Sequence, residues 1–116
     1  MQVVKTVEKP WGREVWIAVT DKYALKILEI RKGARTSLQY HVRKHEHFYV
    51  DSGVLRMEWE EEGGKMITRT LKPGEVVEVK PNRRHRATAV EDVRLIEVST
   101  PELDDIVRVE DDYRRK

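Results

Sequence analysis

The chain contains no cysteine among its 116 residues, which excludes both disulfide bonds and thiolate zinc sites. It also lacks an apolar run long enough to span a bilayer and a signal-peptide pattern at its start. We therefore expect a cytoplasmic protein without a membrane segment. An excess of one charge is missing too, because 23 Lys and Arg residues face 21 Asp and Glu residues, for a formal net charge of +2. This balance argues against a dedicated nucleic-acid surface.

What the chain does have is a series of short β-type segments within a length that suits one domain. Gly, Pro or Asp residues bound most of these segments, and several alternate apolar with polar residues. The sequence predicts strands at Val15–Val19, Tyr23–Arg31, Thr36–His41, His47–Asp51, Val54–Glu60, Lys65–Leu71, Glu75–Val79, His85–Val90 and Val93–Ser99. Glu62-Gly63-Gly64 is the expected tip of a hairpin, and Pro101–Ile106 suggests a short helical turn. This pattern predicts an all-β sandwich or small barrel.

A run of candidate metal ligands lies between two of these strands. Gln39 and His41 are two residues apart, so on a strand their side chains point to the same face. Glu46 follows after an expected turn at Val42–Lys44, and an adjacent strand could return it to the same place. His85, after the turn signal around Pro81, is the candidate fourth ligand. Such nitrogen and oxygen donors can hold one divalent metal with open coordination positions, and zinc, cobalt, manganese, iron and nickel all remain candidates.

One lysine falls within an otherwise apolar strand. Lys26 in the segment Ala24–Leu28 either points into the barrel or shields a sheet edge. Only the first orientation gives it a catalytic part. His45 and His47 flank Glu46 and point opposite to it on a regular strand, so His45 is interpreted as a surface residue.

The ligand run and the second turn carry a resemblance to the cupin superfamily. The first cupin motif is matched at Gly33, His41, Glu46 and Gly53, with Gln39 where the first His usually stands. The second motif aligns at Gly74, Lys80, Asn82, His85 and Ala89. There Lys80 replaces the usual Pro, Ala89 replaces the final Asn, and Asn82 replaces Gly. Asn is the residue next best able to adopt a positive φ.

Further motifs resemble the type II mannose-6-phosphate isomerases, including the C-terminal domain of the enzymes that also carry mannose-1-phosphate guanylyltransferase. The matching segments are Gln39-Tyr40-His41, Lys44-His45-Glu46-His47-Phe48, Ser52-Gly53, Pro10-Trp11-Gly12, His85-Arg86 and the tail Asp104–Tyr113. The resemblance spans nearly the whole chain. Lys44 stands where that family has Arg, and the two cations grip phosphate differently.

The resemblance implies a single cupin domain over residues 1–116: a double-stranded β-helix or jelly-roll barrel, with a core of about 23–100 and terminal strands at 1–20 and 101–116. It implies metal ligation by Gln39, His41, Glu46 and His85, and substrate or phosphate contacts from Arg35, Lys44 and Arg86. His47 matches a family position and joins Lys26 as a candidate acid or base. A homodimer is expected, and the strand pattern at Ile106–Val109 predicts a tail that docks on the barrel or on a second subunit.

These features lead to the hypothesis of a metal-dependent isomerase that interconverts mannose 6-phosphate and fructose 6-phosphate. Its expected partners are a small-molecule sugar phosphate and a second copy of the chain, and neither nucleic acid nor a membrane is expected. Two alternatives stay open. One is a non-catalytic cupin module that binds a sugar or nucleotide-sugar, and Lys44 and the departures in the second motif favour it. The other is a cupin enzyme of different chemistry, such as a dioxygenase, which Gln39 disfavours because that chemistry usually takes a His there.

Overall fold

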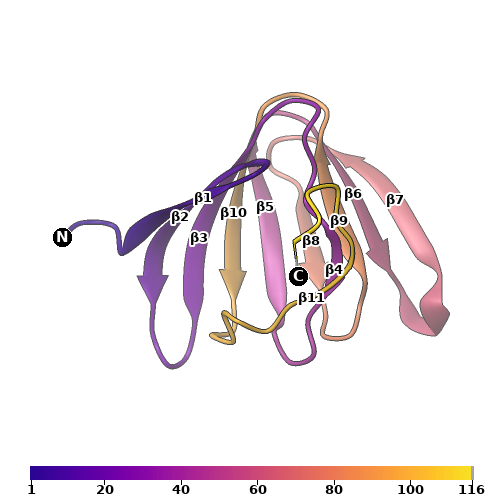
Figure 1. The fold of residues 1–116 in the computed structure, drawn as a ribbon. Coiled ribbons are helices and arrows are strands. Elements are labelled where there is room, and N and C mark those ends of the chain that lie inside the picture. Colours follow the sequence, from indigo (N-terminus) through magenta and orange to yellow (C-terminus); the bar gives the residue numbers. More distant parts are fainter. Residues whose placement is uncertain (116) are drawn as a thin grey trace.

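The computed structural model describes residues 1–115, whose regular structure is almost entirely β (Figure 1). A three-residue 3₁₀ turn at Glu62–Gly64 accompanies eleven strands. The strands are β1 Lys5–Lys9, β2 Gly12–Val19, β3 Ala24–Ile30, β4 Leu38–Tyr40, β5 Glu46–Ser52, β6 Leu55–Glu60, β7 Met66–Leu71, β8 Val76–Val79, β9 His85–Ala89, β10 Val93–Ser99 and β11 Val107–Glu110. Among the described residues, no helix is long and apolar enough to cross a membrane.

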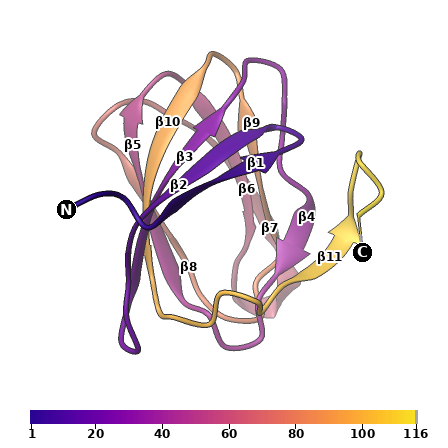
Figure 2. The same ribbon diagram turned by 60° about the vertical axis from the view of Figure 1, so that its left-hand side comes forward.

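The strands form two antiparallel sheets that curve around a common interior (Figure 2). One sheet has six strands in the order β1-β2-β3-β10-β5-β8, and the other has five in the order β11-β4-β9-β6-β7. Neighbours in a sheet are often distant in sequence, as where β10 lies between β3 and β5. This interleaving is the expected jelly-roll barrel, and it brings the starts of β5 and β9 close to the end of β4.

The barrel interior follows from the two-residue period of its strands. Along β3 and β10, alternate residues are buried, because successive side chains point to opposite faces of a sheet. The apolar inward residues form one core, with Ile30, Val50, Leu55, Met57 and Leu95 almost fully buried. Three inward positions are charged: Lys26, Glu46 and Glu97 are each buried. The barrel interior therefore contains a polar region with buried charges as well as an apolar core.

The predicted strands are all present, with two differences at the ends of the chain. The N-terminal strand β1 lies within the expected terminal strands at 1–20, although no strand bounds were predicted there, and it pairs along its whole length with β2. Its polar sequence lacks a clear alternation, and its stability comes from this pairing. The short helical turn expected at Pro101–Ile106 is limited to a single turn at Leu103 and Asp104, in which the backbone N–H of Asp105 donates to the carbonyl oxygen of Glu102. The predicted tail strand is β11, and it docks on β4 of its own barrel.

Two turns bring the candidate ligands together. Asn82 has a φ of 60°, the left-handed conformation expected for this position. Its backbone N–H donates to the carbonyl oxygen of His41 at 2.7 Å. The turn that precedes β9 is thereby fastened to the loop that follows β4.

Candidate metal centre

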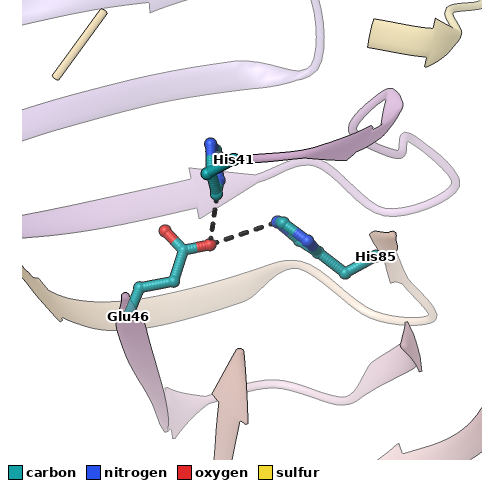
Figure 3. Close-up of side chains that lie close together, drawn as sticks. All are labelled: His41, Glu46 and His85. Atoms are coloured by element: carbon teal, nitrogen blue, oxygen red, sulfur yellow. Dashed lines mark hydrogen bonds and ion pairs between the residues drawn. The ribbon is translucent and has the colours of Figure 1, made fainter. Parts of the chain in front are cut away.

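Three side chains from three different strand ends converge inside the barrel (Figure 3). His41 follows β4, Glu46 opens β5, and His85 opens β9. The Oε2 atom of Glu46 lies 3.2 Å from His41 Nε2 and 3.1 Å from His85 Nε2. All three side chains are at most 4% exposed, so water does little to screen this cluster. The arrangement confirms that the turn at residues 42–44 returns Glu46 to His41.

The second nitrogen of each imidazole is held by a backbone carbonyl. His41 Nδ1 donates to the carbonyl oxygen of Asp105, and His85 Nδ1 donates to that of Arg83. A carbonyl oxygen can only accept, so the proton of each neutral ring sits on Nδ1 and the lone pair of Nε2 faces Glu46. Backbone-oriented imidazoles of this kind are typical of metal ligands.

The cluster therefore collects acceptor atoms without a matching donor. Although the His85 Nε2 atom is close to Glu46, its orientation makes no hydrogen bond among the described residues. A buried carboxylate between two imidazole lone pairs requires an added proton or a cation. Burial raises the pKa of Glu46, but with protons added on the Nε2 atoms the hydrogen bonds from His41 and His85 and the charge of Lys44 outweigh burial and hold this pKa well below its usual range. Two nitrogens and one carboxylate oxygen, with positions left open, fit a divalent metal.

Gln39 lies on the same side of the barrel as this cluster. It is paired with His85 in the register of β4 and β9, and it lines the same cavity. Its Oε1 atom accepts a hydrogen bond from Ser37 Oγ at 2.6 Å, which fixes the orientation of the amide. An amide oxygen has two lone pairs, so one stays available to a metal.

A buried lysine links the metal cluster to a second carboxylate. Lys44 Nζ lies 3.0 Å from Glu46 Oε1 and 2.9 Å from Glu97 Oε2. Burial works against the charge of Lys44, but the two carboxylates outweigh it and raise the pKa of the ammonium. Burial, reinforced by the charge of Glu46, raises the pKa of Glu97. Lys44 was expected to contact the substrate. It lies inside the site, where it forms ion pairs with both Glu46 and Glu97.

The sequence analysis missed Glu97, although a signal was present. Glu97 occupies the inward register of β10 with Leu95 and Ser99, so a charge stands where the alternation places core residues. Across the sheet it pairs with Lys26 of β3. A carboxyl group at an inward strand position next to a lysine is a recognisable sign of a site.

All of these groups line one cavity of about 200 Å³ within the barrel. Lys26 points into this cavity, which is the orientation that a chemical role requires. Its Nζ atom lies 3.5 Å from Glu14 Oε1 and 4.3 Å from the ring centre of Trp16. Three further cations line the cavity, namely Lys9, Arg108 and Arg115. The last two belong to the C-terminal tail, which closes one side of the site.

Three of the expected site residues lie elsewhere. His47 is on the outward face of β5, with its side chain 47% exposed, because it follows the inward Glu46 by one residue. Arg35 makes a two-pronged ion pair with Asp112 in the tail. Arg86 is buried and donates to the backbone carbonyls of Thr36 and Glu110. Both arginines fasten the tail to the barrel, and none of the three residues lines the cavity.

A known protein is similar to nearly the whole of this chain. The xanthan biosynthesis protein XanB of Xanthomonas campestris pv. campestris is 30% identical over 114 residues, which cover 96% of this chain and 24% of that protein. The chain thus spans about a quarter of the length of this curated relative.

Solved structures show the same fold at low sequence identity. KdgF from Halomonas sp. has a TM-score of 0.75 at 24% identity, over 86% of this chain and 90% of that one. An RmlC-like cupin from Shewanella frigidimarina has a TM-score of 0.77 at 19% identity, over 89% and 87% of the two chains. The barrel is therefore a cupin fold.

A family model described as the mannose-6-phosphate isomerase C-terminal domain matches residues 1–111, which is nearly the whole chain. It includes all four candidate ligands, Lys44, Glu97 and the strand β11. The chain belongs to the mannose-6-phosphate isomerase C-terminal family of cupins.

Proposed function

We propose that this protein is a metal-dependent isomerase that interconverts mannose 6-phosphate and fructose 6-phosphate. The observation that carries the proposal is a set of buried donors, His41, Glu46 and His85, in the same cavity as the buried carboxyl group of Glu97. Gln39 would supply a fourth ligand. The bound cation would be one divalent zinc, cobalt, manganese, iron or nickel ion, because imidazole, carboxylate and amide donors suit them all.

The reaction moves a proton between two adjacent carbon atoms of the open-chain sugar. A divalent cation, when bound, acts as a Lewis acid on the C1 and C2 oxygens. Glu97 is the group we assign to take the proton from C2 of the aldose and return it to C1, while the hydroxyl proton of the C2 oxygen is transferred to the C1 oxygen. The raised pKa of Glu97 brings it closer to neutrality, where a carboxyl group both accepts and releases a proton efficiently.

Two lysines complete this part of the site. Lys44 neutralises Glu46 and Glu97 together, which keeps two buried carboxylates close to each other. Lys26 directs its ammonium group into the cavity and is placed to donate hydrogen bonds to sugar oxygens. Glu97 therefore takes the acid–base role that was expected of His47, because the side chain of His47 points outward and does not line the cavity.

The phosphate would be held by cations other than those expected from the sequence. Arg35 and Arg86 bind the tail outside the cavity, whereas Lys9, Arg108 and Arg115 line the cavity itself. Lys9 is paired with Glu14 and Arg115 with Asp111, so a phosphate would share these cations with their carboxylates. Arg side chains suit a phosphate because their planar guanidinium groups can donate two hydrogen bonds to it.

The size of the cavity separates this function from the binding of a nucleotide-sugar. Pockets for larger ligands run from about 300 to 1,000 Å³, and this one is about 200 Å³. A single sugar phosphate in open-chain form fits that size better than a nucleotide-sugar does. The buried carboxyl group of Glu97, which lines the cavity, supports the isomerase because it supplies a base that a binding module does not need. The homodimer and the cytoplasmic location stay predictions of the sequence.

The test is conversion of mannose 6-phosphate to fructose 6-phosphate by purified protein that has been stripped of metal and then reloaded with one metal at a time. We expect activity to return with at least one divalent metal. In His41→Ala, both the bound metal and the activity should be lost. Glu97→Gln should keep the metal and lose activity by a factor of about 10² or more. Glu91→Gln, an exposed carboxylate paired with Lys32, is the control. Absence of conversion with every metal, despite one ion bound per chain, would refute the proposal.

A further inference from the structure

A second group of metal-binding side chains lies on the outer face of the six-stranded sheet. It consists of His45, just before β5, His47 within β5, and Glu78 of β8. One ligand atom from each residue lies within 4.8 Å of the others. This outer cluster is separate from the metal centre inside the barrel.

Strand geometry holds the outer cluster together. His45 and His47 are two residues apart and therefore project from the same face. His47 pairs directly with Glu78 in the register of β5 and β8. The Nε2 atom of His45 lies 2.7 Å from Glu78 Oε2 and that of His47 lies 3.9 Å from it, while the two ring centres are 5.5 Å apart.

The backbone fixes the positions of the two histidines. The N–H of His45 donates to Thr100 Oγ1, and the backbone of His47 belongs to a strand that is paired on both sides. The two imidazoles and the carboxylate therefore start from a common place on the sheet, with their ligand atoms within 4.8 Å of one another. A site on paired strands loses little conformational entropy when it binds its ligand.

The chemistry of the outer cluster is that of a transition-metal site. Two imidazoles with one carboxylate are a frequent ligand set of zinc, with a fourth position left to water. The three side chains are 40–47% exposed, so an ion could enter from solvent.

We propose that His45, His47 and Glu78 bind a divalent transition metal of the zinc class at a second site. Glu46 lies between the two histidines on β5 and points inward, so one strand supplies ligands to two sites on opposite faces of the sheet. The outer ion would join β5 to β8, which is the last strand of its sheet. The proposal does not depend on the isomerase activity.

The experiment is a calorimetric titration of the metal-stripped protein with Zn²⁺, together with NMR spectra of the histidine side chains. In the unmodified protein we expect the His45 and His47 signals to shift in a binding event separate from that of His41 and His85. His47→Gln and Glu78→Gln should each weaken this event by at least about tenfold. Asp51→Asn, which changes an exposed carboxylate on the outward face of the same strand, should leave the event intact.

The three substituted residues are exposed, so the variants should fold normally. Thermal unfolding in the presence of a chelator checks this, and we expect the same midpoint as for the unmodified protein. A Zn²⁺ titration that leaves the His45 and His47 signals unmoved would overturn the proposal. So would a binding event at these histidines that survives His47→Gln unchanged. If the inner site binds no zinc, a single event that is lost in His47→Gln would still establish the outer site.

Discussion

Removing the charge of Lys44 is the sharpest test of how the barrel interior is organised. Its ammonium group lies 3.0 Å from a Glu46 oxygen and 2.9 Å from a Glu97 oxygen, with the side chain 7% exposed. Lys44→Met keeps most of the aliphatic stem and deletes only the charged end. Two buried carboxylates would then lie close together without a cation between them.

The expected loss is large for a domain of this size. Breaking a buried ion pair by removing one partner costs about 3–5 kcal/mol, because the remaining charge stays buried. A typical domain has only about 5–15 kcal/mol of stability in all. At roughly 4 °C per kcal/mol, the midpoint of thermal unfolding should fall by about 12–20 °C. Lys44→Arg keeps the charge and should lose far less.

The loss should depend on pH in a defined direction. The pKa of Glu97 is already raised by burial, and it rises further once Lys44 is gone. A carboxyl group whose pKa is higher in the folded than in the unfolded state destabilises the fold as pH rises through the folded value. The deficit of Lys44→Met should therefore be smallest in mild acid, where Glu97 is protonated, and should grow towards neutral pH.

The assay is urea unfolding of metal-stripped protein at a series of pH values. Glu97→Gln in the Lys44→Met background removes one of the two charges, so it should recover part of the stability at neutral pH. A loss below about 1 kcal/mol would place Lys44 among ordinary surface ion pairs and refute the reasoning. A large loss of stability that is the same at every pH would instead show that ionisation of Glu97 is not its cause.

Two further predictions concern the loops that shape the barrel. Gly53→Ala should unfold the protein or cost more than about 3 kcal/mol in urea unfolding, because φ is +86° and the new Cβ would lie 2.0 Å from the carbonyl oxygen of Asp92. Gly63→Ala has the same φ in open space and should cost only about 1 kcal/mol; equal losses would contradict this account. Asp105→Ala should weaken metal binding by about 10–100-fold in calorimetry, because both carboxylate oxygens accept backbone N–H groups of the loop 42–44. Asp104→Ala is its control, and equal affinity in both variants would show that the loop needs no such anchor.

The strands and part of the ligand set could be read from the sequence because both rest on local geometry. Two-residue alternation is a property of each strand by itself, and so is the turn that returns Glu46 to His41. Asn82 could be assigned a positive φ because few residue types tolerate it. The strand β1 could not be found in this way, because its polar residues are ordered by pairing with β2.

The position of each cation could not be read from the sequence. Arg35 and Arg86 match family positions, yet the fold directs them to the C-terminal tail. Their partners Asp112 and Glu110 come from distant sequence, so no local pattern could pair them. His47 shows the opposite case, because its neighbour Glu46 is inward and strand alternation already indicated an outward side chain.

The sequence by itself determined that this chain is an all-β cupin in which Gln39, His41, Glu46 and His85 are candidate metal ligands, because strand period, turn residues and motif spacing act over short distances. Only the tertiary structure decided which charges share the cavity. Glu97 and Lys26 come from two strands, β10 and β3, and Lys44 comes from the loop before β5; they meet because β10 lies between β3 and β5. Burial then sets their chemistry, since ionised groups at this depth are stable only beside their partners.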